Sequence, residues 1–225
     1  MALTDEESSA PRVERRSLRD QVAGILRDKI LTGDLPADTK VVQSEWAERL
    51  GVSRMPVRDA INQLANEGIV KPSRNGTAIV QAINENEIQD GYELNAALSR
   101  FAASRAAVRR TEEQLGQLVA IQDDIDTAVS ERRLDAASKL NWSFHRLINV
   151  SAQSPRLIAL LQLLSPSIPH SAFEVIEEWP ARAANDHRKI IQALRDQDAA
   201  AAGVLVYEHV LAGASAMMTE RGRRT

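Results

Sequence analysis

Three histidines are candidate metal ligands. His145, His187 and His209 fall in three different helical stretches, and 21 residues separate the last two. Three imidazoles brought inward from three helices could hold a transition metal such as zinc or nickel and leave further coordination positions open. Asn141 lies four residues before His145, so these two side chains share one face of a helix. The alternative is that the histidines are ordinary core residues.

An arginine pair is a candidate for DNA recognition. Arg54 and Arg58 lie one turn apart near the start of a predicted helix. Their guanidinium groups could donate to O6 and N7 of guanine or to a phosphate. The N-terminus of a helix is positively polarised, and it is the end that a helix-turn-helix recognition helix presents to bases. The pair therefore predicts DNA binding, although surface arginines at this spacing also occur on solvated faces and on winged helices that bind proteins.

The residues around this pair predict a helix-turn-helix. Ser44–Leu50 forms a short helix that stops at Gly51. Ser53 can cap the next helix, and Pro56 falls in its first turn, where a missing N–H costs little. Gly68 supplies the C-terminal stop. The buried stripe of this second helix consists of Val57, Ile61 and Leu64.

A β-hairpin wing is predicted to follow. Ile69–Pro72 and Thr77–Val80 are β-like runs around Ser73–Gly76, and the Asn-Gly pair in that turn is a strong hairpin signal. Arg74 places a cation at the tip. Upstream, an apolar stripe that ends before Gly33 predicts a helix able to cover the core: Leu18, Val22, Ile25, Leu26 and Ile30. Residues 15–82 are therefore predicted to form a winged helix-turn-helix.

This segment resembles the N-terminal domain of GntR-type bacterial transcription regulators. The resemblance lies in LRDQVAGILRDKILTGDL, in WAERLGVSRMPVRDAINQLANEGIV and in RNGTAIV, and Ser53–Ala60 is its most specific part. It implies that DNA is contacted by Arg54, Met55, Arg58 and the wing glycine Gly76; the pattern itself adds Ser53 and Arg74.

Two positions depart from that family. Ser44 stands where members often carry an arginine that touches DNA, and Ala37 stands where many have glycine. We expect an altered operator preference with DNA binding retained.

Composition and charge limit the class of protein. A chain of 225 residues with 44% hydrophobic and 4% aromatic residues is long enough for two domains and favours helices. Net charge is −3, yet residues 12–82 carry 12 Lys/Arg against 9 Asp/Glu. The absence of cysteine excludes disulfides and thiolate metal sites. No run has the length and apolarity of a membrane span, and residues 1–14 predict a disordered tail, so a cytoplasmic protein with no membrane partner is expected.

The second half, residues 83–220, predicts an all-α bundle of six or seven helices joined to the winged domain by a short connection. Helical patterns without a convincing strand run through Glu87–Arg109, Glu112–Val129, Leu134–Val150, Arg156–Leu164, His170–Glu178, Ala181–Leu194 and Ala199–Thr219. The expected fold is therefore mainly α.

This half resembles the FCD domain, the ligand-binding domain of the FadR subfamily. The resemblance lies in Asn141–Ile148, in Asp186–Leu194 and at His209. In many members an Asp and three His bind a divalent metal at D-x3-H and H-x21-H spacings. The resemblance therefore implies His145, His187 and His209 as ligands, with Asn141 in place of the Asp. A neutral carbonyl in place of an anionic ligand predicts weaker metal binding, or none.

The same resemblance implies an effector pocket. Tyr92–Ser99 aligns with a family pattern that has Arg at Asn95 and Glu at Ser99, and that Arg often pairs with an acidic effector. The candidate pocket residues here are Asn95, Tyr92 and Arg146. Without the Arg, an anionic effector would depend on the metal, on another cation such as Arg100 or Arg146, or on neither.

Three functions remain open from the sequence. The first is a homodimeric transcription regulator that binds a pseudo-palindromic operator and is controlled by a small metabolite, possibly an organic acid, with repression the commoner mode. The second is a dimeric regulator whose bundle only dimerises. The third is a metal-dependent hydrolase, which lacks a recognisable general base and leaves the winged domain unexplained. We therefore expect a regulator and no enzyme.

Overall fold

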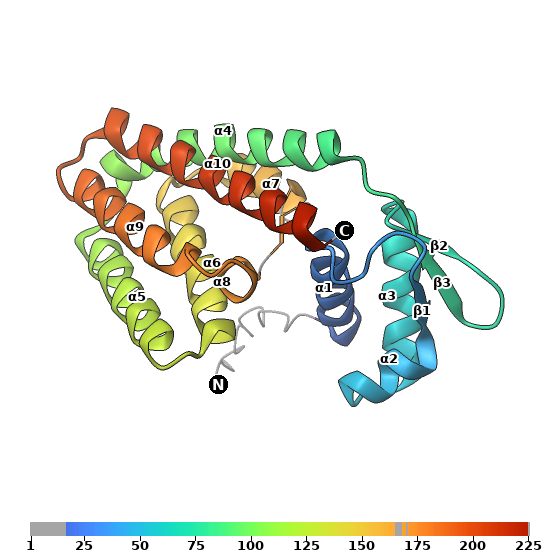
Figure 1. Ribbon diagram of the computed structural model, residues 1–225. Coiled ribbons are helices and arrows are strands. Elements are labelled where there is room, and N and C mark those ends of the chain that lie inside the picture. Colours follow the sequence, from blue (N-terminus) through green and yellow to red (C-terminus); the bar gives the residue numbers. More distant parts are fainter. Residues whose placement is uncertain (1–16, 165–167, 170, 225) are drawn as a thin grey trace, which may run out of the picture.

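The structure is a computed structural model that describes residues 17–164, 168–169 and 171–224 (Figure 1). The predicted disordered tail lies outside these residues. Helices dominate both parts of the chain, as expected, and a small antiparallel sheet belongs to the first part.

The N-terminal part is a winged helix-turn-helix. Its elements are α1 (Leu18–Leu31), β1 (Lys40–Val42), α2 (Gln43–Leu50), α3 (Arg54–Asn66), β2 (Val70–Pro72) and β3 (Thr77–Val80). The strands lie in the order β1-β3-β2, with Lys40 opposite Ile79 and Val70 opposite Val80. The hairpin of β2 and β3 was predicted. Strand β1 was not predicted, because three residues are too few to show an alternating pattern.

Local signals explain where these helices begin and end. The Ser17 hydroxyl accepts a hydrogen bond from the Asp20 amide and caps α1. Gly51 ends α2 in the left-handed region at φ 64°, which a side chain would disfavour. Ser53 is the N-cap residue of α3, but its side chain makes no capping hydrogen bond, so the expectation of a side-chain cap is wrong.

The C-terminal part is a bundle of seven helices among the described residues. They are α4 (Glu85–Arg109), α5 (Glu112–Ser130), α6 (Leu134–Ser151), α7 (Pro155–Leu164), α8 (Ala172–Val175), α9 (Trp179–Arg195) and α10 (Ala199–Arg224). The predicted helix at His170–Glu178 is reduced to the single turn of α8. β3 ends at Val80 and α4 begins at Glu85, so the predicted boundary between residues 82 and 83 falls in the connection.

Helices α4 and α10 are the two longest and run side by side (Figure 1). Gly203 allows them to approach closely. A Cβ at this position would overlap the Ser104 hydroxyl and would lie 3.2 Å from the backbone oxygen of Arg100. A larger residue would therefore force α10 away from α4.

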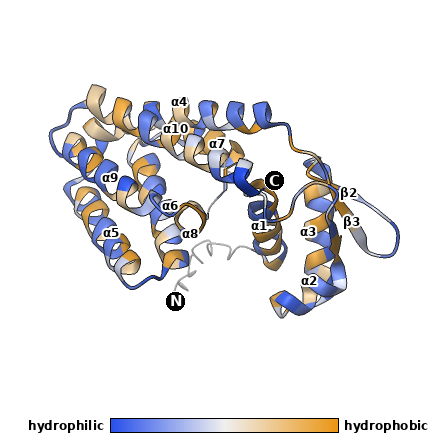
Figure 2. Ribbon diagram, in the orientation of Figure 1, coloured by the Kyte–Doolittle hydropathy of each residue, from blue (hydrophilic) through white to orange (hydrophobic). Residues whose placement is uncertain are grey.

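One expectation about α10 needs correction. An 18-residue window of this helix reaches a mean hydropathy of 1.3, so by length and composition it could cross a membrane, contrary to the sequence analysis. Its packing gives another reason for this composition. The helix lies between α4 and α9 (Figure 2). Its apolar residues Ala202 and Val206 belong to the bundle core.

Gly203→Ala tests the close approach of the two helices. We expect it to lower the free energy of unfolding by about 1–3 kcal/mol, because the added methyl group displaces α10 or Ser104. Urea denaturation followed by circular dichroism measures the change. Gly116→Ala on α5 is the matched control. Nothing lies within 4 Å of its added Cβ, and we expect a gain of about 0.5–1 kcal/mol from helix propensity. A stabilised Gly203→Ala variant would contradict the packing argument.

Candidate metal centre and DNA-binding surface

Helices α6, α9 and α10 bring the three predicted histidines together. One ligand atom from each of His145, His187 and His209 lies within 4.8 Å of the others. The ring centroids of His145 and His187 are 5.3 Å apart, and those of His187 and His209 are 4.9 Å apart. Histidines separated by up to 64 residues in the chain thus face one point, which is the arrangement that a metal ion needs.

Burial keeps the imidazoles of His145 and His187 in the form that binds metals. It lowers the pKa of His145 to about 3, and His209 adds to this shift. Burial also holds the pKa of His187 well below its ordinary value, with the neighbouring histidines contributing. Removal from water disfavours the charged imidazolium, and adjacent cations would repel one another. Neutral imidazole at pH 7 is therefore expected for His145 and His187, and neutral imidazole is the form that binds a metal.

Outer hydrogen bonds fix which ring nitrogens are left for a ligand. His187 Nδ1 lies 2.7 Å from Gln122 Oε1, and the Gln122 amide nitrogen in turn donates to Asp126. This orients Gln122 so that its oxygen accepts from Nδ1–H, leaving Nε2 as the bare nitrogen. His209 Nδ1 likewise lies 3.3 Å from Asp186 Oδ2, and this hydrogen bond lowers the pKa of Asp186.

Two buried acceptor atoms of the candidate ligands have no hydrogen-bond partner among the described residues. They are His187 Nε2 and Asn141 Oδ1. A buried acceptor without a partner is costly in a folded protein, and its retention needs an explanation. A divalent cation would satisfy both atoms. Three neutral imidazoles and one amide oxygen therefore fit zinc or nickel as a donor set, and Asn141 would be its weakest member.

Gln122 and Asp186 were not assigned a role by the sequence analysis. Asp186 directly precedes His187, and Gln122 lies on α5, 65 residues away from it. A glutamine in a helix ordinarily indicates an exposed position, and only 2% of Gln122 is exposed. Its contact with His187 is set by tertiary packing, so no local pattern reveals it.

The three candidate effector residues lie in different surroundings. Asn95 is half-buried on α4, and its Oδ1 accepts a 3.3 Å hydrogen bond from Ser99. Tyr92 is buried in an apolar cluster with Leu31 of α1, and Arg146 is exposed next to His145. Their assignment to an effector pocket stays a prediction.

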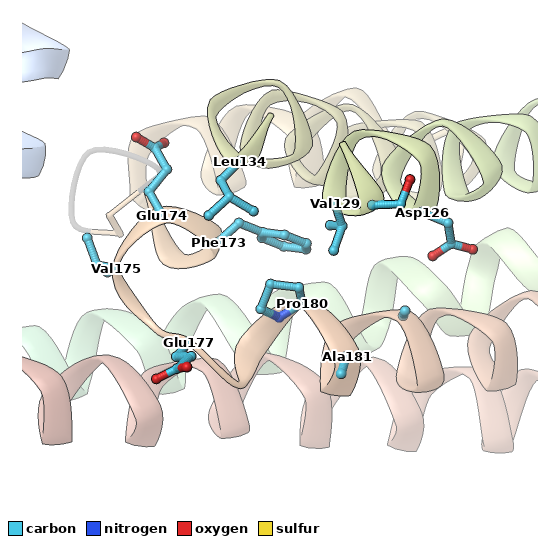
Figure 3. A pocket seen from close by; sticks show the side chains of 11 residues that line it. Asp126, Val129, Leu134, Phe173, Glu174, Val175, Glu177, Pro180 and Ala181 are labelled. Atoms are coloured by element: carbon cyan, nitrogen blue, oxygen red, sulfur yellow. The ribbon is translucent and has the colours of Figure 1, made fainter. Parts of the chain in front are cut away.

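A separate groove opens between α5, α6, α8 and α9 (Figure 3). Phe173, Leu134 and Val129 line it, and the carboxylates of Glu174 and Glu177 lie beside them. None of the three histidines belongs to its lining. This groove is therefore distinct from the histidine centre.

The predicted DNA-contacting residues lie on α3 and on the wing. Ser53, Arg54, Met55 and Arg58 are exposed at the start of α3, where 63% of the Met55 surface faces solvent. Arg74 is exposed in the turn between β2 and β3.

The wing turn has the backbone that its sequence predicts. Asn75 and Gly76 take φ values of 61° and 71°, as an Asn-Gly hairpin turn requires. The backbone N–H of Gln43 donates to the Gly76 carbonyl over 3.0 Å. A Cβ on Gly76 would lie 3.1 Å from the side-chain oxygen Oε1 of Gln43. Glycine therefore holds the wing against the start of α2.

Comparison with known proteins follows this division of the chain. Residues 18–80 match the model of bacterial regulatory proteins of the gntR family, and residues 90–212 match the FCD domain. An HTH-type transcriptional regulator of Mycobacterium tuberculosis strain H37Rv is 30% identical over 185 residues, or 79% of this chain and 75% of that protein. The gluconate operon transcriptional repressor of Bacillus licheniformis is 25% identical over 83% of this chain and 79% of its own length.

The fold is also found among solved structures. The Escherichia coli protein McbR/YncC superposes with a TM-score of 0.70, covering 91% of this chain and 99% of that one. At 19% sequence identity, this likeness shows a shared fold.

Two substitutions test the metal centre. We expect His187→Ala to lower the affinity for zinc at least about tenfold, because it removes a neutral nitrogen ligand. We expect Asn141→Asp to raise it by a similar factor, because an anionic oxygen replaces the amide. Isothermal titration with zinc after chelation measures both. Ser143→Asp adds the same charge on the exposed face of α6 and is the control for Asn141→Asp. Equal affinities in wild type and His187→Ala would show that the histidines serve only the core.

Proposed function

This protein belongs to the GntR family of bacterial regulatory proteins and carries an FCD domain, and we propose that it is a cytoplasmic, homodimeric repressor whose operator affinity changes when a small organic acid binds its helical domain. It is a DNA-binding transcription regulator, as its relatives are. The repressor mode is supported by the Bacillus licheniformis relative, which is named as a repressor of the gluconate operon.

The exposed start of α3 is the observation that carries the DNA-binding role. Arg54 and Arg58 project from the positively polarised end of this helix, while Val57, Ile61 and Leu64 on its other side are buried in the domain core. In such a module the recognition helix enters the major groove with its first turns next to the bases. Arg58 lies 3.2 Å from Asp59 at the surface, an exposed pair weak enough for a base or phosphate to replace.

The histidine centre supports an anionic effector. A divalent ion held by three neutral imidazoles and an amide would keep both of its charges, because none of these donors is anionic. The Asp186 carboxylate would offset the charge of the ion only indirectly, through its hydrogen bond with the His209 imidazole. A carboxylate ligand would then be attracted to the ion in a site largely removed from water. If the centre binds neither metal nor acid, the bundle serves only for dimerisation.

An exposed apolar stripe on α4 supports a dimer with a second copy of the chain. Leu94, Phe101 and Val108 repeat every seven residues, with 56%, 49% and 61% of their surfaces exposed. This spacing places them on one face of α4, as in helices that pair with a partner helix. Leu160 and Leu163 of the neighbouring α7 are also exposed. A two-fold axis across this stripe would bury it against itself, and would give two recognition helices for a palindromic operator.

Substitutions in the DNA-binding surface test the function. DNA recovered with the protein from genomic fragments supplies the operator, and fluorescence anisotropy measures its affinity. We expect Arg58→Ala to weaken specific binding by about 1–3 kcal/mol and to relax selectivity at one base position. We expect Arg74→Ala to weaken all DNA binding and to lower the salt dependence by about one unit. Arg19→Ala removes an exposed charge of α1 and is the control. Wild-type affinity in Arg58→Ala would contradict this docking.

Phe101→Glu tests the dimer surface. Half of this side chain is exposed, so the substitution leaves the core of the bundle unchanged. We expect it to convert a dimer into a monomer, because two carboxylates would oppose each other across the two-fold axis. Sedimentation velocity measures the mass. Ile25→Glu, at an exposed apolar residue of α1, is the control and should remain dimeric. A dimeric Phe101→Glu protein would place the interface elsewhere.

A further inference from the structure

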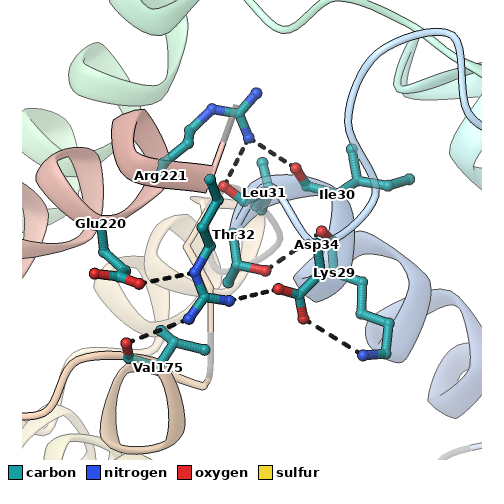
Figure 4. A network of polar contacts seen from close by, with 9 residues as sticks. Lys29, Ile30, Leu31, Thr32, Asp34, Val175, Glu220 and Arg221 are labelled. Carbon is teal, nitrogen blue, oxygen red and sulfur yellow. Dashed lines mark hydrogen bonds and ion pairs between the residues drawn. The ribbon is translucent and has the colours of Figure 1, made fainter.

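The last turns of α10 contact the end of α1 in the DNA-binding domain (Figure 4). Arg221 Nη1 donates to the backbone oxygens of Ile30 and Leu31 over 2.7 and 2.8 Å. The final carbonyls of a helix have no partner within it and carry partial negative charge, so a guanidinium is well suited to cap them. Only 8% of Arg221 is exposed, and the contact is therefore largely shielded from water.

A second arginine extends this contact. Arg224 forms an ion pair with Asp34, which follows α1, and a 2.8 Å hydrogen bond to Glu220 of its own helix. Its Nη2 also donates to the Val175 oxygen of α8 over 3.4 Å. Lys29 completes the network from α1, 3.5 Å from Asp34. Two separate guanidinium groups thus join the end of α10 to the same end of α1.

The polar contacts surround an apolar one. Leu31 of α1 packs with Ile88 and Tyr92 of α4 and with Ala214 of α10. The end of α1 is therefore held between the two helices that pack closely at Gly203. The only covalent connection between the two parts is the short segment from Gln81 to Asn84.

Helix α1 is in turn joined to the recognition helix. Arg27, which is 8% exposed, contacts Glu67 at the end of α3 through Nε at 2.8 Å and Nη2 at 2.6 Å. A paired, two-point contact of this kind fixes orientation as well as distance. Leu26 and Leu64 pack in the same core. A displacement of the end of α1 is therefore passed on to α3.

Helix α10 also carries a residue of the metal centre. His209 precedes Arg221 by twelve residues on one continuous helix, a distance of about 18 Å at 1.5 Å per residue. Trp179 packs against both His209 and Gly213 on the way, with its ring centroid 5.3 Å from that of His209. A shift of His209 on binding a ligand would therefore move the helix whose last turn carries Arg221.

We propose that the contact of Arg221 with the Ile30 and Leu31 carbonyls is a latch through which the state of the histidine centre sets the orientation of the winged domain. The latch rests on the proposed function, because it gives that ligand site a route to DNA. With the latch formed, α1 is clamped and the recognition helix has one orientation. When α10 shifts, the winged domain turns about residues 81–84, and the spacing of two recognition helices in a dimer changes. The operator then binds with a different affinity.

Operator titrations with and without zinc test the latch, with zinc alone as the probe. The measured quantity is the ratio of the two operator affinities. We expect a ratio of about 5–150 for the wild type, the usual range of allosteric coupling, and a ratio within about twofold of one for Arg221→Gln. Arg223→Gln is the matched control. It removes the same charge from the same turn, but Arg223 is exposed and contacts only Glu220 among the described residues. A wild-type ratio of one, or an undiminished ratio in Arg221→Gln, overturns the latch.

Hydrogen exchange provides a measurement that needs no DNA. We expect the amides of residues 28–35 to exchange at least about tenfold faster in Arg221→Gln than in wild type or Arg223→Gln, because the end of α1 loses its cap. Unchanged exchange there in Arg221→Gln overturns the latch. If Arg221→Gln loses structure throughout, Arg221→Lys takes its place; it keeps the charge but has a shorter reach and should show a smaller increase. If the wild type binds no operator, the proposed function fails, and the exchange measurement still decides whether Arg221 holds α1.

Discussion

The packing of α10 along α4 is the constraint on which the rest of the structure depends. Gly203 lets the two helices approach so closely that a Cβ at this position would overlap the Ser104 hydroxyl, and the helices remain paired over most of their length. Helix α10 then supplies Val206 to the bundle core and His209 to the candidate metal centre. Its last turn supplies Arg221 to the DNA-binding domain. A single helix thus carries residues of the bundle core, the candidate ligand site and the domain junction. A displacement of α10 in one of these regions therefore affects the other two.

The histidine centre has an energetic cost that a ligand would offset. Burial without a partner leaves His187 Nε2 and Asn141 Oδ1 unsatisfied, and each such atom costs about 1–3 kcal/mol. The hydrogen bond that His187 Nδ1 donates to the Gln122 oxygen holds the other ring nitrogen and prevents the ring from turning away. Ligand atoms that are neutral, oriented and without a hydrogen-bond partner are preorganised to bind a metal ion.

Features set by neighbours in the chain could be predicted from the sequence. Gly51, Pro56 and the Asn-Gly turn each impose a local backbone geometry, and helix α3 and the wing follow from them. The three histidines could be named because the resemblance to the FCD domain supplied their spacing. Features set by tertiary packing could not be predicted. Gln122 is an ordinary helical glutamine until α5 packs on α9, and Arg221 contacts carbonyls about 190 residues earlier in the chain. Every residue has a backbone carbonyl, so no residue type marks the ones that accept these hydrogen bonds. A helix cap formed between two domains therefore cannot be predicted from the sequence.

Asn95, Ser99 and Asn141 are neutral residues at three positions where the FCD resemblance implies charged ones. Together they change the distribution of charge in the helical domain. The FCD resemblance places an Arg and a Glu at positions 95 and 99; here Asn95 accepts a hydrogen bond from Ser99 instead. Exchanging an Arg and a Glu for two neutral residues leaves the charge of that face of α4 unchanged. Exchanging the metal-binding Asp for Asn141 leaves the centre one unit more positive. With a metal bound as proposed, an anionic effector would lose a cationic partner on α4 and gain attraction at the histidine centre, so its recognition would move from α4 toward α6, α9 and α10. Because the last turn of α10 carries Arg221, such a shift would place the effector closer to the helix that reaches the DNA-binding domain.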